Sequence, residues 1–332
     1  MSADLEQLTQ LHFKHTADRM LAVMRFGESP ASARESFAEL VDALKDPDFG
    51  VRSSAAAALV NIGVEAVPHL ESLLDDPRQL VRVNAACNLL KIQAHDPALA
   101  VLADAMRADQ KEKIKRNAFY DLANMGPAAV RALPAILLAL DDPAHSVRER
   151  AFDILQILGP LASPAVPRLL QLWERKQNKA EVVFTLGCMG PAAAPAVPQL
   201  IEALSRKSTS LQARAATALG EIGPEARAAV PELVRVLNSG SGSVPARAAE
   251  SLAKIGAPAE GAAPGLFKLL KHKALAVRLT AARTLALLDP DKAKKALPIL
   301  AKDYRKHEFD RDEIAEIARL IDAREAQKRG LF

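Results

Sequence analysis

The sequence predicts an all-α solenoid, and three observations support that prediction. The first is composition: 49% of the 332 residues are hydrophobic but only 4% are aromatic, so the apolar residues are mostly small or aliphatic and suit closely packed helices. The second is a sequence repeat with a period of about 33 residues. The third is the helical spacing of the apolar residues inside each period. Together these features are typical of stacked helix pairs, each in contact with its neighbours.

A proline that follows Val, Leu or Ala marks the repeat. Aligned on this proline, the segments share the pattern VPxLxxxLxDPxxxVRxxAAxALxxIGPxA. Successive gaps between these prolines are 66 (twice 33), 33, 31, 33, 33 and 34 residues. The prolines are Pro68, Pro134, Pro167, Pro198, Pro231, Pro264 and Pro298.

The first half of each repeat predicts a helix, which we call helix A. The repeat proline begins it, at a position where the missing N–H has no helical partner in any case. Leucines follow at helical spacing, as in Leu70, Leu73 and Leu74. The Asp-Pro pair then ends helix A, because the residue before a proline avoids helical backbone angles.

The second half predicts helix B, which begins at Val-Arg. Counting offsets from that Val as zero, apolar residues fall at offsets 0, 4, 8 and 11, as in Val81, Ala85, Leu89 and Ile92. This spacing places them in one stripe. The small residue at offset 4 allows neighbouring helices to approach closely, and the Ile-Gly-Pro sequence ends helix B with a glycine cap.

The repeats extend over the whole chain, so we expect a single solenoid at residues 1–332 with about ten helix pairs. An N-terminal capping repeat would occupy residues 1–36, and eight repeats of about 30–34 residues would occupy residues 37–296. A charged C-terminal capping repeat would occupy residues 297–332.

These motifs resemble the HEAT-repeat family, which has an armadillo-type fold, and within it the short repeats named after the phycobilisome lyases. The resemblance rests on the proline of helix A, the Asp-Pro turn, the Val-Arg start of helix B and the Ile-Gly-Pro end. It implies a right-handed superhelix of antiparallel helix pairs, with the B helices on the concave side. It also implies a function in binding other proteins.

An acid and a base recur six residues apart around the turn between helices A and B. A catalytic pair would occur once, whereas these pairs recur with the repeat, so we interpret them as structural. The resemblance implies that they form a ladder that links adjacent turns. Gln212, Pro245 and Asp312 replace the arginine later, which predicts weaker bracing of the C-terminal half. The pairs are Asp46–Arg52, Asp76–Arg82, Asp109–Lys115 and Asp142–Arg148.

The sequence contains no motif of a catalytic or metal site. There is one His-Glu dipeptide, His307-Glu308, whereas the HEAT-like deoxyhypusine hydroxylases use several to hold two irons. Cys87 and Cys188 form no CxxC motif, and both are expected on the outward side of helix B without a histidine base nearby. We therefore expect neither an enzyme nor a metal or other cofactor.

The aromatic residues and the glycine-rich stretch also give no indication of a nucleotide-binding or phosphate-binding site. Trp173, the single tryptophan, takes the last leucine position of a helix A and is expected in the core. HEAT-like DNA glycosylases, in contrast, line their concave face with aromatic and acidic residues. The SGSGS stretch at residues 239–243 has neither a preceding strand nor a following lysine, so it predicts a turn rather than a phosphate-binding loop.

The face of helix B opposite its apolar stripe, at offsets 2, 3, 6 and 10, is the candidate binding surface. Arginine and aromatic side chains anchor many protein interfaces, and asparagine adds adaptable hydrogen bonds. The competing interpretation is that these larger side chains merely fill the concave side of the solenoid. The candidate residues are Asn84, Arg116, Asn117, Tyr120, Arg150, Asp153 and Phe184.

The leading functional hypothesis is a non-enzymatic scaffold that binds a peptide or helix of another protein along a concave groove. The alternative is an auxiliary subunit of a modifying enzyme, similar to a phycobilin lyase subunit, that binds a tetrapyrrole. Nucleic-acid binding is a weaker alternative. From Lys268 onward there are 16 Lys and Arg against 10 Asp and Glu, a net charge of +6, but the acids are interspersed with the bases.

The N-terminus and the apolar runs bear on localisation. Asp4 and Glu6 lie where a signal peptide would be basic. No apolar run approaches the roughly 18–20 residues of a membrane span. These features predict a cytoplasmic protein without a membrane partner, and we expect it to be a monomer.

Overall fold

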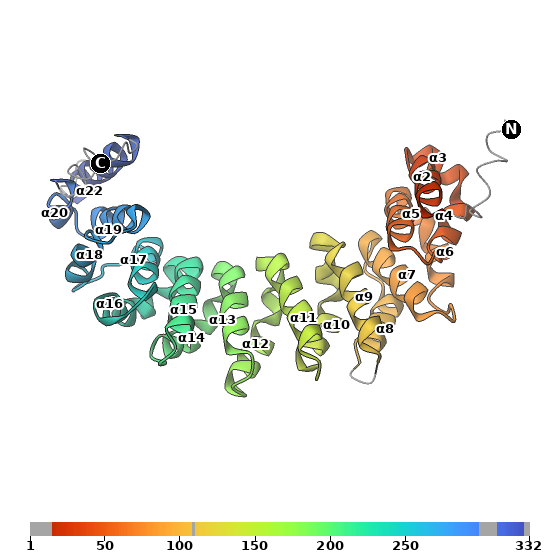
Figure 1. Cartoon of the computed structure of the whole chain (residues 1–332), viewed down its shortest axis with the longest axis horizontal. Coiled ribbons are helices and arrows are strands. Elements are labelled where there is room, and N and C mark those ends of the chain that lie inside the picture. Colours follow the sequence, from red (N-terminus) through yellow and green to blue (C-terminus); the bar gives the residue numbers. More distant parts are fainter. Residues whose placement is uncertain (1–14, 108–109, 299–310, 329–332) are drawn as a thin grey trace. The chain divides into compact units, whose positions relative to one another are not determined.

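The computed structural model describes residues 15–107, 110–298 and 311–328, which form α- and 3₁₀-helices and contain no strand (Figure 1). The helices alternate between A and B positions, which confirms the predicted all-α solenoid. The chain divides into two compact units, Met1–Leu158 and Gly159–Phe332. The expected capping repeats lie partly outside the described residues, so their bounds stay predictions.

Unit 1 contains five described B helices with A helices between them. The A positions hold α3 (Pro30–Glu35) with α4 (Phe37–Ala43), η1 (Gly63–Ala66) with α6 (Val67–Ser72), α8 (Asp96–Ala105), and η2 (Gly126–Ala132) with α10 (Leu133–Leu138) and η3 (Ala139–Asp141). The B helices are α2 (Thr16–Phe26), α5 (Phe49–Ile62), α7 (Gln79–Ile92), α9 (Glu112–Ala123) and α11 (His145–Leu158).

Unit 2 repeats the same order. The A positions hold η4 (Gly159–Ala165) with α12 (Val166–Glu174), η5 (Gly190–Ala196) with α14 (Val197–Leu204), η6 (Gly223–Ala229) with α16 (Val230–Ser239), α18 (Ala263–Leu269) and α20 (Pro290–Ala293). The described B helices are α13 (Lys179–Cys188), α15 (Thr209–Ile222), α17 (Val244–Ile255), α19 (Leu275–Leu288) and α22 (Arg311–Lys328).

The glycine after helix B ends it as predicted. Gly63 has φ 81° and Gly223 has φ 78°, backbone angles that residues with a Cβ rarely adopt. Between several of these glycines and the next A helix the chain forms a 3₁₀ turn, such as η5, which the repeat pattern did not predict. The repeat proline lies in the first turn of helix A, where it breaks no hydrogen bond.

The predicted apolar stripe of helix B lies in the core. Val81, Ala85 and Leu89 are buried on α7. Trp173 is buried on α12, and its Nε1 donates to Glu202 at 3.0 Å, so the prediction that it is a core residue is confirmed. Burial with a satisfied N–H is the arrangement expected of a structural tryptophan.

Two glycines allow the B helices of unit 2 to pack closely. A Cβ on Gly187 would lie 3.2 Å from Cα of Ala218, and a Cβ on Gly220 would lie 2.9 Å from Cα of Ser251. The contact at Gly220 is too close for any side chain, because it includes a backbone atom of α17, and a side chain at Gly187 would require α15 to shift slightly. The faces of α13, α15 and α17 that point away from the core therefore form one continuous surface.

Hydroxyl groups at offset 7 join consecutive B helices of unit 2. Ser251 on α17 donates to the carbonyl of Ala216 on α15 at 2.6 Å. Thr284 on α19 donates in the same way to the carbonyl of Ala249 on α17 at 3.1 Å. Each hydroxyl is also within hydrogen-bond distance of a carbonyl one turn earlier on its own helix, so no buried polar atom is left without a partner there.

The arginine of each acid–base pair binds the backbone of its own turn. Nη1 of Arg52 donates to the Asp46 carbonyl at 2.8 Å, and Arg82 and Arg148 make the same contact at 2.8 and 2.7 Å. Gln212 donates to the Leu204 and Arg206 carbonyls at 2.9 and 2.8 Å, so a turn without the arginine also receives a side-chain donor. Arg278 donates to the His272 carbonyl in the same way, at 2.7 Å.

Two of the aspartate carboxylates bind a cation of the preceding repeat, whereas Asp76 pairs with Arg78 of its own turn at 2.9 Å. Arg19, which takes the arginine position of the first repeat, lies 2.7 Å from Asp46, and Lys115 lies 2.5 Å from Asp142. Both members of the Lys115–Asp142 pair are buried. Asp109 lies outside the described residues, as does the side chain of Asp312.

Candidate functional site

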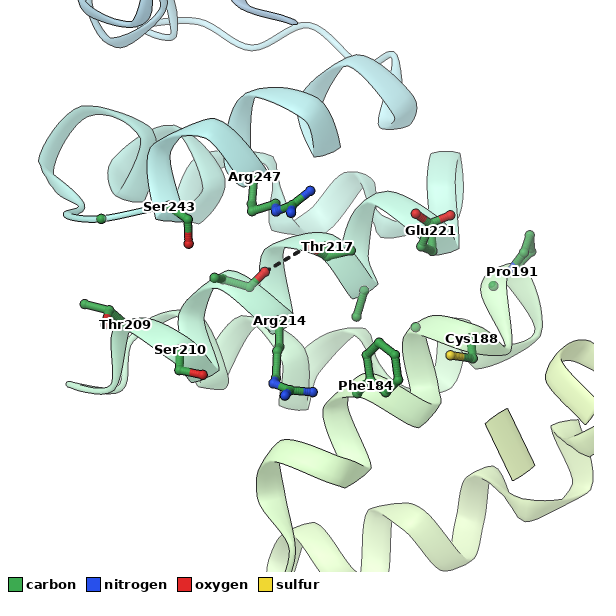
Figure 2. A pocket seen from close by; sticks show the side chains of 15 residues that line it. Phe184, Cys188, Pro191, Thr209, Ser210, Arg214, Thr217, Glu221, Ser243 and Arg247 are labelled. Carbon is green, nitrogen blue, oxygen red and sulfur yellow. Dashed lines mark hydrogen bonds between the residues drawn. The ribbon is translucent and has the colours of Figure 1, made fainter. Parts of the chain in front are cut away.

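A groove of about 1170 Å³ crosses the exposed faces of α13, α15 and α17 in unit 2 (Figure 2). Seven of its 15 lining residues lie at offsets 2, 3, 6 and 10 of these helices, the face that the sequence pattern indicates. Figure 2 shows Thr209, Ser210 and Ser243 towards one end and Cys188 and Pro191 towards the other. The B-helix residues that line it are Phe184, Gly187, Cys188, Thr209, Ser210, Ala213, Arg214, Thr217, Ala218, Glu221 and Arg247.

The floor of the groove is apolar and smooth. Phe184 is 45% exposed although its ring is large and hydrophobic. Gly187 and Ala218 lie beside it, where the close helix packing leaves no side chain to fill the space. An exposed aromatic ring over such a floor offers contact area to a ligand.

The charged groups lie on α15 and α17. The guanidinium of Arg214 lies over the Phe184 ring, 5.3 Å from its centroid. Arg247 pairs with Glu250 at 3.2 Å, and Lys254 contacts both Glu221 and Glu250 at 2.8 and 3.0 Å.

Burial opposes the charge of Lys254, but its hydrogen bonds to Glu221 and Glu250 outweigh that effect and raise its pKa. Burial likewise opposes the charge of Glu250, and its contacts with Lys254 and Arg247 lower its pKa nonetheless. Lys254 and Glu250 therefore both stay charged over the physiological pH range.

Cys188 lies at the end of the groove near Glu221 and is half-buried. Burial, with a smaller effect from the Glu221 carboxylate, raises the pKa of its thiol. Since the thiolate is the reactive form, this environment does not activate the thiol as a nucleophile.

In unit 1, several predicted binding residues are exposed on neighbouring B helices. Arg116 is exposed and Asn117 is half-buried on α9, where Tyr120 is 54% exposed. Arg150 and Asp153 on α11 form an exposed ion pair at 3.0 Å. Phe184 belongs to unit 2, where it lies with Arg214 rather than with a residue of the predicted set.

Two expectations for α7 are wrong. Asn84 is only 3% exposed, so it cannot present its side chain to a partner, and Cys87 is buried rather than directed outward. On α7 the residues from Val83 to Leu90 are all buried, and the side chain of Asn84 lies against Asn88 and Asp121 instead of solvent.

A buried polar cluster replaces the expected surface at α7. Nδ2 of Asn88 donates to Oδ1 of Asn84 at 2.9 Å, and Asp121 on α9 lies beside them, 8% exposed. Burial raises the pKa of Asp121 to about 6, against the attraction of Arg52 and Lys91 and a hydrogen bond with Asn84. The sequence carried a signal for this cluster, because Asn88 and Asp121 both take offset 7, where α5 and α15 have alanine.

In the part of the chain that the structure describes, no cluster of three or more His, Cys, Asp or Glu side chains is suited to hold a metal ion. The His307-Glu308 dipeptide lies outside these residues. Among the described helices, none combines the length and apolarity required to cross a bilayer.

A family model for HEAT repeats matches residues 5–91, 197–264 and 230–318, more than half of the chain. The chain belongs to the HEAT-repeat family. No curated protein sequence matches it.

Solved structures support the same fold for this HEAT-repeat chain. An engineered protein is 22% identical, with 96% of this chain and 98% of that chain covered and a TM-score of 0.52. The karyopherin Kap121p, bound to the extreme C-terminus of the protein phosphatase Cdc14p, is 15% identical over 97% of this chain and 42% of its own, with a TM-score of 0.60. Importin beta is 13% identical over 96% and 53%, with a TM-score of 0.54. The chain thus spans about two fifths of Kap121p and about half of importin beta.

Proposed function

We propose that this HEAT-repeat chain is a non-enzymatic scaffold that binds a helix or an extended segment of another protein on the exposed faces of its B helices. The groove over α13, α15 and α17 is the observation that supports this function most directly. Its volume of about 1170 Å³ exceeds the roughly 300–1000 Å³ of ordinary small-molecule pockets, and it is spread over three helices. Kap121p, similar in fold, is bound to a terminal segment of a protein, which is the same kind of ligand.

The exposed residues of α9 and α11 form a second proposed contact surface, in unit 1. Tyr120 at offset 6 is more than half exposed and therefore contributes little to the core. Arg116 is also exposed and can donate two parallel hydrogen bonds to a carboxylate, as can Arg150 if the exposed pair with Asp153 opens.

The test starts by capturing partners from the native host with three versions of the full chain. These are the wild type, a groove variant with Phe184→Ala and Arg214→Glu, and a control with Arg227→Glu, an exposed arginine of the same unit that does not line the groove. We expect a partner that the wild type and the control capture and the groove variant does not.

Calorimetry with that partner then measures each surface. Phe184→Ala should weaken binding at least about tenfold, as expected when an interface anchor is truncated. Tyr120→Ala with Arg150→Ala should have a similar effect if the partner reaches unit 1, while the melting midpoint barely changes. A partner that binds all of these variants with the affinity of the wild type would exclude the B-helix faces as the binding surface.

The tetrapyrrole alternative also has a structural observation in its favour. Two arginines, Arg214 and Arg247, stand over an apolar floor, which suits a planar apolar group that carries carboxylates. A bilin titrated into the full chain would show a shifted absorption spectrum that Arg214→Glu abolishes. An unchanged spectrum would leave the protein-binding function as the better interpretation.

A further inference from the structure

We propose that the groove of unit 2 selects an acidic protein segment, in which carboxylates lie next to an apolar side chain. This inference rests on the proposed function and specifies the chemistry of the partner. It follows from the charges along the groove and from the single aromatic ring in its lining.

Arg214 supplies a positive charge that has no acidic counterpart. Its side chain is exposed, and among the described residues its contact is with the Phe184 ring, whereas no carboxylate pairs with it. Stacking on a ring occupies the face of the guanidinium and leaves its N–H donors free at the edge. These donors match the two oxygens of a carboxylate in a bidentate contact.

The remaining charges of the groove do not cancel this excess. Arg247, Lys254, Glu221 and Glu250 form one network of two cations and two acids, so Arg214 leaves a net charge of +1. The Arg247–Glu250 pair is half-exposed, and exposed pairs of this kind contribute little free energy. Arg247 can therefore exchange Glu250 for a carboxylate of the partner, while Lys254 still holds Glu250.

The hydroxyl end of the groove extends the surface for carboxylates. Thr209 and Ser210 lie in the first turn of α15, and Ser243 precedes α17 without capping it. These groups donate hydrogen bonds, and the N-terminal ends of the two helices favour negative charge. A second carboxylate of the segment fits here, beside Arg214 and Arg247 (Figure 2).

The apolar side chain of the segment would pack against Phe184. At the same offset, α15 has Thr217 and α17 has Glu250, so the ring is the one large apolar side chain at this position among the three helices. Gly187 and Ala218 keep the floor beside it open. Because Arg214 touches the ring, the acidic and the apolar side chain of the partner would be close together in its sequence.

A nucleic acid is disfavoured by the same network. Its phosphates recur along the whole backbone, and a strand that follows the groove past Arg214 would meet the carboxylates of Glu221 and Glu250. A segment with only a few carboxylates can place them at Arg214 and Arg247 and avoid these two acids.

The experiment uses the full chain and fluorescein-labelled peptides of about 12 residues, which span roughly 18 Å as a helix. One set carries Asp and Glu around a central Leu, a second replaces the acids with Asn and Gln, and a third keeps the acids but replaces Leu with Ser. A labelled single-stranded oligonucleotide is the fourth probe. Fluorescence anisotropy gives the dissociation constants for the wild type and for Arg214→Gln, Arg214→Glu, Phe184→Ala and the control Arg227→Glu.

We expect the acidic peptides with Leu to bind at least about tenfold more tightly than the neutral peptides and the Ser peptides. Arg214→Gln and Arg214→Glu should remove most of the preference for acids, and Phe184→Ala most of the preference for Leu. Arg227→Glu should change each dissociation constant by less than about twofold. Thermal midpoints equal to that of the wild type show that the variants are folded. If Arg214→Glu is not folded, Arg214→Gln, which keeps much of the length of the side chain, takes its place in the comparison.

Equal binding of acidic and neutral peptides overturns the inference. If that binding is still sensitive to Phe184→Ala, the proposed function stands without the acidic specificity. If no peptide binds and the groove variant captures the same partners as the wild type, both the acidic specificity and the proposed function are overturned. An oligonucleotide that binds more tightly than the acidic peptides, or an Arg227→Glu effect as large as that of Arg214→Glu, replaces the inference with nonspecific charge attraction.

Discussion

The buried carboxyl of Asp121 should make the stability of the protein depend on pH, and Asp121→Asn should remove that dependence. The pKa of Asp121 is raised from 3.8 to about 6 in the fold, chiefly by burial. The difference of about 2 units corresponds to about 3 kcal/mol of unfolding free energy, at 1.36 kcal/mol per unit. Asn88 and Asn84 already supply amide groups beside the carboxyl, so an amide at position 121 fits the chemistry of its surroundings.

The sign follows from proton binding. Between about pH 4 and pH 6 the folded state holds the proton of Asp121 more strongly than the unfolded state, so stability falls as pH rises through this window. Below about pH 4 the carboxyl is protonated in both states and the penalty is absent, and above about pH 6 the penalty is complete. The amide introduced by Asp121→Asn carries no charge at any pH, so the variant should gain up to about 3 kcal/mol over the wild type at pH 7 and nothing at pH 4.

Urea denaturation of both proteins from about pH 4 to pH 8 measures this difference, and other titrating groups cancel in the comparison. The expected curve rises between about pH 4 and pH 6 and is flat above. A difference that does not change with pH would show that Asp121 is not a buried carboxyl with a raised pKa.

The remaining predictions concern packing and the acid–base ladder. Arg82→Ala should lower the unfolding free energy by about 1–3 kcal/mol, because it leaves the partly buried carbonyl of Asp76 without this donor, and an unchanged melting midpoint would contradict this. Lys115→Met should cost about 3–5 kcal/mol because it strands the buried Asp142, and adding Asp142→Asn should recover most of the loss; a double variant as unstable as the single one would argue against an uncompensated charge. Gly220→Ala should destabilise by about 1–3 kcal/mol because its Cβ would lie 2.9 Å from Cα of Ser251, a backbone atom that no substitution at position 251 removes; a fully stable Gly220→Ala would show that α15 and α17 can move apart.

The sequence predicts the fold well because the same local signals, a glycine after helix B and an apolar stripe along it, recur in successive repeats. Glycines such as Gly223 adopt the positive φ that ends helix B, and residues such as Leu89 lie in the core as the stripe indicates. The 3₁₀ turns between helices B and A were not predicted, since η5 and η6 both begin with Gly-Pro and are rich in alanine, a composition compatible with several turn geometries. A periodic pattern locates helices and their faces, and it leaves the path of the connection open.

The candidate site was predicted less completely, because an offset specifies a face and not the exposure of that face. Phe184 and Arg214 both lie on the predicted face of helix B. The candidate residues were taken mainly from the middle repeats, so they included Phe184 but not Arg214. Asn84 takes the same offset as Arg214 and is nevertheless buried, because it packs with Asn88 and with Asp121 of the next B helix. Such coverage depends on the packing of adjacent repeats, which one repeat does not encode.

Asp121, the residue at offset 7 of its helix B, makes the stability of unit 1 depend on pH, whereas ligand binding at the groove of unit 2 does not depend on this residue. In unit 2 the hydroxyls of Ser251 and Thr284 donate to a carbonyl of the preceding B helix, a contact that does not depend on pH. In unit 1 Asp121 takes this position, and burial favours its protonated form by raising its pKa to about 6. Beside the groove of unit 2, in contrast, burial opposes the charges of Lys254 and Glu250, but contacts with Glu221 and Glu250 raise the pKa of Lys254, and contacts with Lys254 and Arg247 lower the pKa of Glu250. Ligand binding at the groove should therefore stay constant between about pH 6 and pH 8, whereas unit 1 should gain stability as the pH falls below about 6 and Asp121 takes up its proton.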